Sequence, residues 1–400
     1  MNKFFKDSSI YVFGQIVANL PSFLLIPYLT RKLGADGYGV MSYYIFYMTL
    51  FGIFVGLCQD GAVARYFYFY GKRNLKSIVI VGYIYATFIS FCILITAYFL
   101  NLKIIMLISL ISLTQAMLSV QLAIRQCQKK PISYVVIQIA TSFFIVFFTV
   151  FLLEYFSEDL VFYRFLALFL ANLLAVLLAY YFLKGYKIRL NKNNFKISFL
   201  YIFSFGFPLV FHHISGLLKG QFDRVLIYSS YSNAQLGIYA AAFNIALIFN
   251  VLLMCVNKAT LPYYYEALKN KKLNGKKIRK LSLVFLPFSF LPVCIILLIP
   301  NSVFLWFLGG EFVGAKYYTA LFILGFSFVP TYLVLVNYLF YYAKNKIISI
   351  CSVISCLIYL IVLFITSKID IKFIPLSMII SNLVILPMLY YETMKIKEEK

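Results

Sequence analysis

One apolar segment in the second half of the chain carries a stripe of polar and small residues. At helical spacing these residues share one face, and they are His212, Ser215, Gly216, Lys219 and Asp223. His213 and Arg224 lie beside the stripe. Polar side chains within a long apolar helix are costly and usually face a cavity or another helix. We therefore predict a polar cluster that faces a cavity; the alternative is an interfacial or structural Lys219–Asp223 pair.

Other apolar segments carry polar side chains at similar spacing. They are Tyr11, Gln15, Asn19 and Ser22 in the first segment, Asp60 and Arg65 at the inner end of the second, and Thr114, Gln121, Arg125 and Gln128 in the fourth. Each stripe alone is more often a contact between helices than a binding site. Because such stripes occur in both halves of the chain, together they predict a hydrophilic central cavity.

The charged candidates for this cavity are mostly cationic. The cations are Arg65, Arg125, Lys219 and Arg224, with Lys258 as a further candidate, and the acids are Asp60 and Asp223. The planar fork of an arginine matches phosphate oxygens, and a lysine adds a point charge. We therefore predict an anionic, phosphate-bearing ligand, supported by the polar residues Gln15, Asn19, Asp60, His212 and Asp223. Either histidine could carry a proton or orient a ligand, or could simply pack between helices.

The sequence contains no pattern typical of a catalytic site. It has no glycine-rich phosphate loop, and its seven cysteines show neither metal-ligand spacing nor a disulfide framework. The acids Glu154, Glu158 and Asp159 lie together between two apolar segments, where we expect a solvated outer turn. We therefore predict a protein that is not an enzyme, with no catalytic residue, metal or cofactor.

The elements that position these residues are membrane helices. Hydrophobic residues make up 63% of the chain, the mean hydropathy is +0.90 and only 12% of residues are charged. A helix needs roughly 20 apolar residues to cross the hydrocarbon core. The apolar runs have this length and do not alternate, so we predict an all-α polytopic membrane protein rather than a barrel.

About twelve spans are predicted. The runs are 10–30, 39–62, 75–100, 103–124, 132–153 and 164–184, and then 198–228, 236–260, 280–308, 316–342, 346–367 and 372–392. A basic connector after the sixth run divides the chain into an N-terminal bundle, 1–190, and a C-terminal bundle, 191–400. Gly39 and Gly237 lie close to half of the chain apart, and an even-numbered unit repeats without inversion. The two six-helix bundles should therefore be related by a pseudo-two-fold axis along the membrane normal.

The net charge of +23 is explained better by the orientation of the chain in the membrane than by nucleic-acid binding. Most of the 36 lysines and arginines fall on the segments that share a side with both termini. This asymmetry predicts cytoplasmic termini and no nucleic-acid partner. The cationic N-terminal lead runs into an apolar segment longer than a signal peptide, which predicts an uncleaved first span.

Several short motifs, taken in their order along the chain, are similar to those of a known family. They are L-T-R-K-L-G-A-D-G-Y-G at 29–39, G-A-V-A-R at 61–65, D-R-V-L-I-Y at 223–228, L-G-I-Y-A-A-A at 236–242 and G-G-E-F-V-G-A at 309–315. The chain resembles the bacterial O-antigen and polysaccharide-unit flippases (Wzx-type) of the multidrug/oligosaccharidyl-lipid/polysaccharide exporter superfamily. It departs from them at 229–233, where a Ser/Asn run replaces a glycine common in that loop.

The resemblance implies a function in the bacterial inner membrane. A polyprenyl-pyrophosphate-linked oligosaccharide would be flipped to the outer leaflet by alternating access, for O-antigen, lipopolysaccharide or capsule biosynthesis. Arg65 and Arg224 would engage the pyrophosphate, Lys219 and Arg125 would add positive potential, and Asp223 would hold Lys219 or Arg224. The implied partners are the lipid-linked substrate, membrane lipids, and the polysaccharide polymerase and chain-length machinery. A multidrug antiporter of the same superfamily and a membrane-embedded glycosyltransferase or O-unit polymerase are the alternatives.

Overall fold

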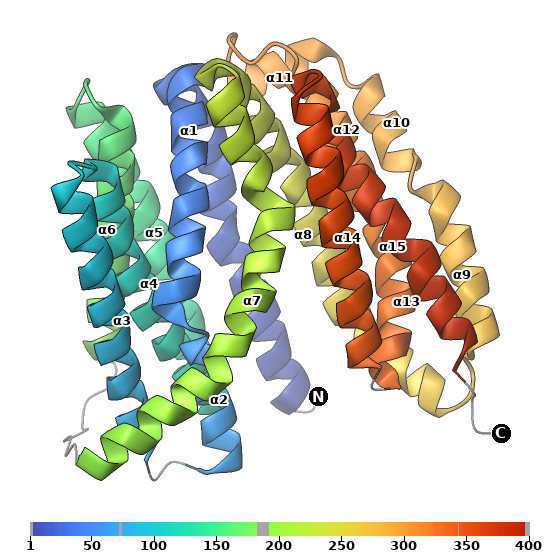
Figure 1. The fold of residues 1–400 in the computed structure, drawn as a ribbon, viewed down its shortest axis with the longest axis horizontal. Coiled ribbons are helices and arrows are strands. Elements are labelled where there is room, and N and C mark those ends of the chain that lie inside the picture. The colour runs from blue at the N-terminus through green and yellow to red at the C-terminus, as the bar shows by residue number, and fades with distance from the viewer. Residues whose placement is uncertain (1–2, 72–73, 182–191, 343, 397–400) are drawn as a thin grey trace. The chain divides into compact units, whose positions relative to one another are not determined.

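The computed structural model describes residues 3–71, 74–181, 192–342 and 344–396 (Figure 1). These residues are helical almost throughout, as the sequence predicts. The α-helices are α1 Lys3–Gly56, α2 Gln59–Phe69, α3 Leu75–Phe99, α4 Lys103–Cys127, α5 Pro131–Tyr155, α6 Leu160–Tyr181, α7 Lys192–Ser230, α8 Asn233–Lys269, α9 Gly275–Phe288, α10 Leu291–Leu298, α11 Asn301–Leu308, α12 Ala315–Ser327, α13 Val329–Tyr341, α14 Asn345–Ser367 and α15 Leu376–Met394. A single 3₁₀ turn, η1 Ile371–Phe373, precedes α15.

Eleven candidate membrane spans occur within these described ranges, by length and composition, against about twelve predicted. The difference arises at α1, in which two helices meet at Gly34, a residue with non-helical backbone angles, so that the candidate Phe23–Phe69 covers the first two predicted runs. Each of the other predicted runs overlaps one candidate. The run predicted at 280–308 is divided into α9, α10 and α11. Pro287, Pro292 and Pro300 lie at or near these breaks, where a proline removes a backbone donor.

The chain divides into two compact units. Unit 1 comprises Met1–Leu33 and Val40–Leu217, and unit 2 comprises Gly34–Gly39 and Leu218–Lys400. The chain therefore passes between the units within α1 and again within α7. The border predicted between residues 190 and 191 lies outside the described residues.

In unit 1, α6 packs closely because one of its faces consists of small residues. Ala167, Ala171, Ala175 and Ala179 recur every four residues and are fully buried. Small side chains allow two helix backbones to approach closely, which is how helices associate within lipid. The partners of α6 are α4 and α5, whose buried residues include Leu118 and Ile137.

In unit 2, α8 packs against α12, and α14 packs against α15 (Figure 1). Ala240, Ala241 and Ala242 of α8 are fully buried. The Tyr239 ring meets Phe322 of α12 edge to face, with ring centroids 5.0 Å apart. This arrangement is favourable for aromatic pairs beyond the area that they bury.

Candidate functional site

The polar residues near the end of α7 lie inside a helix rather than in a loop. Helix α7 continues to Ser230 and belongs to the candidate span Asn194–Ser230. The turn that follows is short, because Ser232 caps α8 in a capping box with Gln235. Lys219, Asp223 and Arg224 therefore lie within the span, as the sequence predicts.

The carboxylate of Asp223 is buried and held by neutral donors. Asp223 is only 5% exposed. Oδ1 accepts a hydrogen bond from the backbone N–H of Arg224 at 2.8 Å, and Oδ2 accepts one from the Tyr239 hydroxyl at 2.5 Å. A buried carboxylate needs such donors, because an unsatisfied polar group is costly in a low-dielectric interior. Asp223 thus links α7 to α8.

The guanidinium of Arg224 lies over an aromatic ring. Arg224 is 4% exposed, and its Cζ lies 5.1 Å from the centroid of the Phe243 ring. A desolvated cation gains from the negative face of such a ring. Within the described part of the chain, this guanidinium makes no ion pair with a carboxylate at 4.0 Å or less. Its donors therefore remain suited to an anionic group.

Lys219 connects three helices of unit 2. Its Nζ donates to Ser355 Oγ of α14 at 2.8 Å, and Ser355 Oγ donates to the carbonyl of Ser381 in α15 at 2.8 Å. The ammonium thus donates to a neutral hydroxyl oxygen. Together, Lys219, Asp223 and Arg224 form a cluster on α7 that we call the α7 polar cluster, and two of its three charged groups are cationic.

The arginines predicted in unit 1 have different surroundings. Arg65 of α2 is exposed, and its Cζ lies 5.6 Å from the ring centroid of Phe205 and 5.8 Å from that of Phe69. Asp60, in the first turn of the same helix, is also exposed. Arg65 is therefore held on aromatic faces while its donors are open to a ligand.

Arg125 is 3% exposed and acts as a clamp between helices. Its Nη1 donates to Gln121 Oε1 at 2.7 Å, and its Nη2 donates to the Ala179 carbonyl of α6 at 2.5 Å. The Ala179 carbonyl lies in the last turn of α6, where carbonyls lack partners within their own helix. The structure therefore gives Arg125 a contact between helices, which is the alternative stated above for a single polar stripe.

The remaining predicted residues are not part of the α7 polar cluster. His212 is exposed, and its ring lies beside that of His213 with centroids 5.6 Å apart. Lys258 is exposed on α8. Gln15 and Asn19 lie in α1, but their side chains fall outside the described residues.

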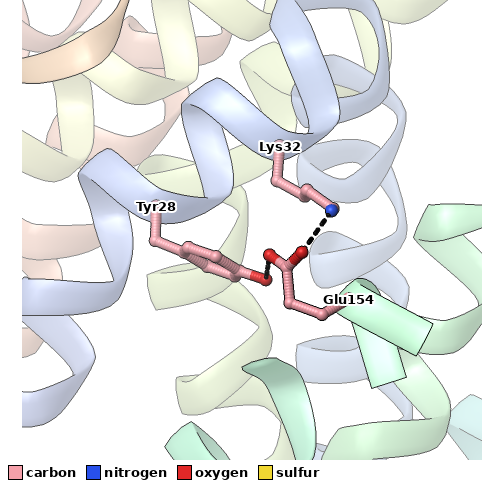
Figure 2. A network of polar contacts seen from close by, with 3 residues as sticks. All are labelled: Tyr28, Lys32 and Glu154. Carbon is pink, nitrogen blue, oxygen red and sulfur yellow. Dashed lines mark hydrogen bonds and ion pairs between the residues drawn. The ribbon is translucent and has the colours of Figure 1, made fainter. Parts of the chain in front are cut away.

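A polar network that the sequence analysis missed joins α1 to α5 (Figure 2). Glu154 accepts a hydrogen bond from the Tyr28 hydroxyl at 2.8 Å and pairs with Lys32 Nζ at 2.9 Å. Glu154 is exposed to solvent, as expected, and it also bonds to two residues of α1. The only local signal was the four-residue spacing of Tyr28 and Lys32, which places them on one helix face.

The fold is similar to that of solved MOP-superfamily transporters. The structure is similar to an inward closed conformation of the lipid II flippase MurJ, with a TM-score of 0.73 and 13% identity over 98% of this chain and 88% of that one. It is also similar to an inward-facing multidrug resistance MATE family transporter, with a TM-score of 0.68 and 14% identity over 95% and 94% of the two chains.

The sequence comparisons show the family. The profile of the polysaccharide biosynthesis protein family matches residues 4–268, so the chain belongs to that family. It is 46% identical to "Lsg locus putative protein 1" of Haemophilus influenzae, over 99% of both chains. It is 42% identical to an "Uncharacterized membrane protein" of the same organism, over 99% of this chain and 98% of the relative.

Proposed function

We propose that this protein is a flippase for polyprenyl-pyrophosphate-linked oligosaccharide units. It moves complete units from the cytoplasmic to the outer leaflet of the bacterial inner membrane by alternating access, for O-antigen or capsule biosynthesis. Its termini are cytoplasmic. Membership of the polysaccharide biosynthesis family and the MOP fold support a transport step in that biosynthesis.

The observation that carries the proposal is the excess positive charge of the α7 polar cluster. Arg224 is almost fully buried in a candidate membrane span and makes no ion pair at 4.0 Å or less with a carboxylate of the described chain, and Lys219 donates to the neutral Ser355 Oγ. Asp223, the acid of the cluster, is already engaged by Tyr239 and a backbone amide. A pyrophosphate would supply the missing negative charge, and a guanidinium offers donors in the matching geometry.

The unit 1 arginines have supporting roles in this proposal. Arg65 presents an exposed guanidinium on α2 that can contact phosphate oxygens directly. Arg125 adds positive potential, while its donors remain on Gln121 and Ala179.

The test is a gene deletion followed by mass spectrometry of lipid-linked oligosaccharides. Deletion should cause complete units to accumulate on the inner leaflet. Accumulation of incomplete units would instead indicate a glycosyltransferase, and normal delivery of units with altered drug sensitivity would indicate a multidrug antiporter.

Variants expressed in the deletion strain test the cluster itself. Arg224→Gln and Lys219→Gln should each reduce delivery of complete units about tenfold or more, because a hydrogen bond to a charged group contributes about 1.5–3 kcal/mol. Lys368→Gln is the matched control, since Lys368 is exposed just after α14. Full delivery by both cluster variants at equal protein abundance would contradict the proposal.

A further inference from the structure

Six residues of α1 belong to unit 2, although the helix on either side of them belongs to unit 1. These residues, Gly34–Gly39, are called the docking segment here. It begins at a kink, where Gly34 has φ 65° and ψ −179°. A residue with a Cβ rarely adopts this conformation, whereas glycine does so readily. Gly34 can therefore change its backbone angles with little steric cost.

A glutamate of unit 2 caps the helix that restarts after the kink. Glu311 lies in the loop between α11 and α12, and its Oε2 accepts a hydrogen bond from the Ala35 N–H at 2.8 Å. The first N–H groups of a helical stretch have no partner within the helix, and a negative charge at this end is favourable. Glu311 thus does for α1 what a local N-cap residue does in other helices.

Two glycines allow the docking segment to lie directly against the start of α8. A Cβ at Gly39 would lie 2.0 Å from the Asn233 carbonyl oxygen, and a Cβ at Gly237 would lie 1.9 Å from the Ala35 carbonyl oxygen. The two contacts are reciprocal. Ala35 precedes Gly39 by four residues, as Asn233 precedes Gly237, and each glycine meets the carbonyl oxygen of the other pair.

The docking segment also makes a side-chain contact to α8. The Tyr38 hydroxyl accepts a hydrogen bond from Asn244 Nδ2 at 2.7 Å, and its ring meets Phe312 edge to face with centroids 6.1 Å apart. The other members of the segment are small or polar, so they bury little apolar area. The contact is close in geometry but modest in hydrophobic stabilisation.

Helix α1 is held on the unit 1 side just before the kink. Tyr28 and Lys32 both bind Glu154 of α5 (Figure 2). One glutamate from each unit therefore holds α1, one on either side of Gly34. Between these two contacts the chain changes direction at Gly34, where two helices meet and the backbone angles are ones that glycine adopts readily.

We propose that the docking segment is a releasable catch, meaning that it binds the rest of unit 2 reversibly. The hydrogen bond from Ala35 to Glu311, the latch, holds the segment in place, and Gly34, the pivot, is the residue at which the chain bends. When the catch is closed, Glu311 caps Ala35 and the glycine backbones interlock. When it opens, the segment leaves α8 and the α11–α12 loop, and Gly34 takes up the change in direction. This inference concerns conformation and does not depend on which substrate is transported.

Hydrogen exchange of the purified full-length protein, followed by mass spectrometry, tests the latch. Glu311→Ala removes the acceptor for the Ala35 amide, whereas Glu311→Gln keeps an amide oxygen in its place. Glu158→Ala is the matched control, because Glu158 is an exposed acid in the α5–α6 loop. In Glu311→Ala, peptides covering 35–39 should exchange about tenfold faster, and Glu311→Gln and Glu158→Ala should match the parent.

Three results would overturn the proposal. The first is unchanged exchange at 35–39 in Glu311→Ala, and the second is equally fast exchange in Glu311→Gln. The third is faster exchange throughout α8 and α12, because Glu311 would then support the fold of unit 2 as a whole. Loss of substrate transport plays no part in this readout, so the catch and the proposed function can fail separately.

Discussion

The reciprocal glycine contact makes a quantitative prediction for Gly39→Ala. A Cβ at this position would lie 2.0 Å from the Asn233 carbonyl oxygen, whereas ordinary van der Waals contact begins at 3.4 Å. The neighbouring atom belongs to the backbone, so no flexible side chain can move out of the way. The docking segment and α8 would have to separate by more than 1 Å to accommodate one methyl group.

The net effect combines two opposing contributions. Alanine within a helix is more favourable than glycine by about 1 kcal/mol. Overpacking a tight contact costs about 1–3 kcal/mol and occasionally more, and a backbone clash belongs at the upper end of that range. We therefore expect Gly39→Ala to lower the free energy of unfolding by about 2 kcal/mol, and Gly237→Ala to have a similar effect.

The assay is unfolding of the purified protein in mixed micelles with increasing SDS. Gly52→Ala is the matched control in the same helix, because a Cβ at Gly52 would meet nothing within 4 Å. It should stabilise the protein or leave it unchanged. The double variant Gly39→Ala/Gly237→Ala should lose less than the sum of the single losses, since either substitution already separates the two segments. Stability equal to the parent in both single variants would refute the reasoning.

Two further predictions concern unit 1 and use the same unfolding assay. Arg125→Met should lower the free energy of unfolding by about 3 kcal/mol, because Gln121 and the Ala179 carbonyl would lose a buried donor; a neutral result would show that these oxygens find other partners. Glu154→Gln should cost less than about 1 kcal/mol, because the side chains of Lys32 and Glu154 are 30% and 55% exposed. A loss above 2 kcal/mol would mean that this ion pair is more than a surface interaction.

The fold could be predicted largely from local features of the chain. A helix in a bilayer must satisfy its own backbone, so each long apolar run predicts one span. At α1 the two predicted runs correspond to two helices that meet at Gly34, a residue with non-helical backbone angles, although together they form one candidate span. The prediction was weakest at 280–308, where prolines divide the run into α9, α10 and α11.

The candidate site could be predicted in part. The apolar run predicted at 198–228 placed Lys219 and Asp223 in one helix, and α7 confirms this because hydrophobicity and helix periodicity are local properties. The same argument grouped Arg125 with them, yet Arg125 binds a carbonyl of α6. Periodicity indicates which residues share a face of one helix, and it does not indicate what that face meets.

By itself, therefore, the sequence determined the helices, their lengths and the polar residues within them, because these depend on hydrophobicity and spacing along one segment. Only the tertiary structure decided that Glu154 holds Lys32, that Glu311 caps Ala35 and that Gly39 and Gly237 interlock. These contacts join segments distant in the chain. Their physical reason is that a single hydrogen bond or a close backbone approach leaves no periodic pattern in the sequence.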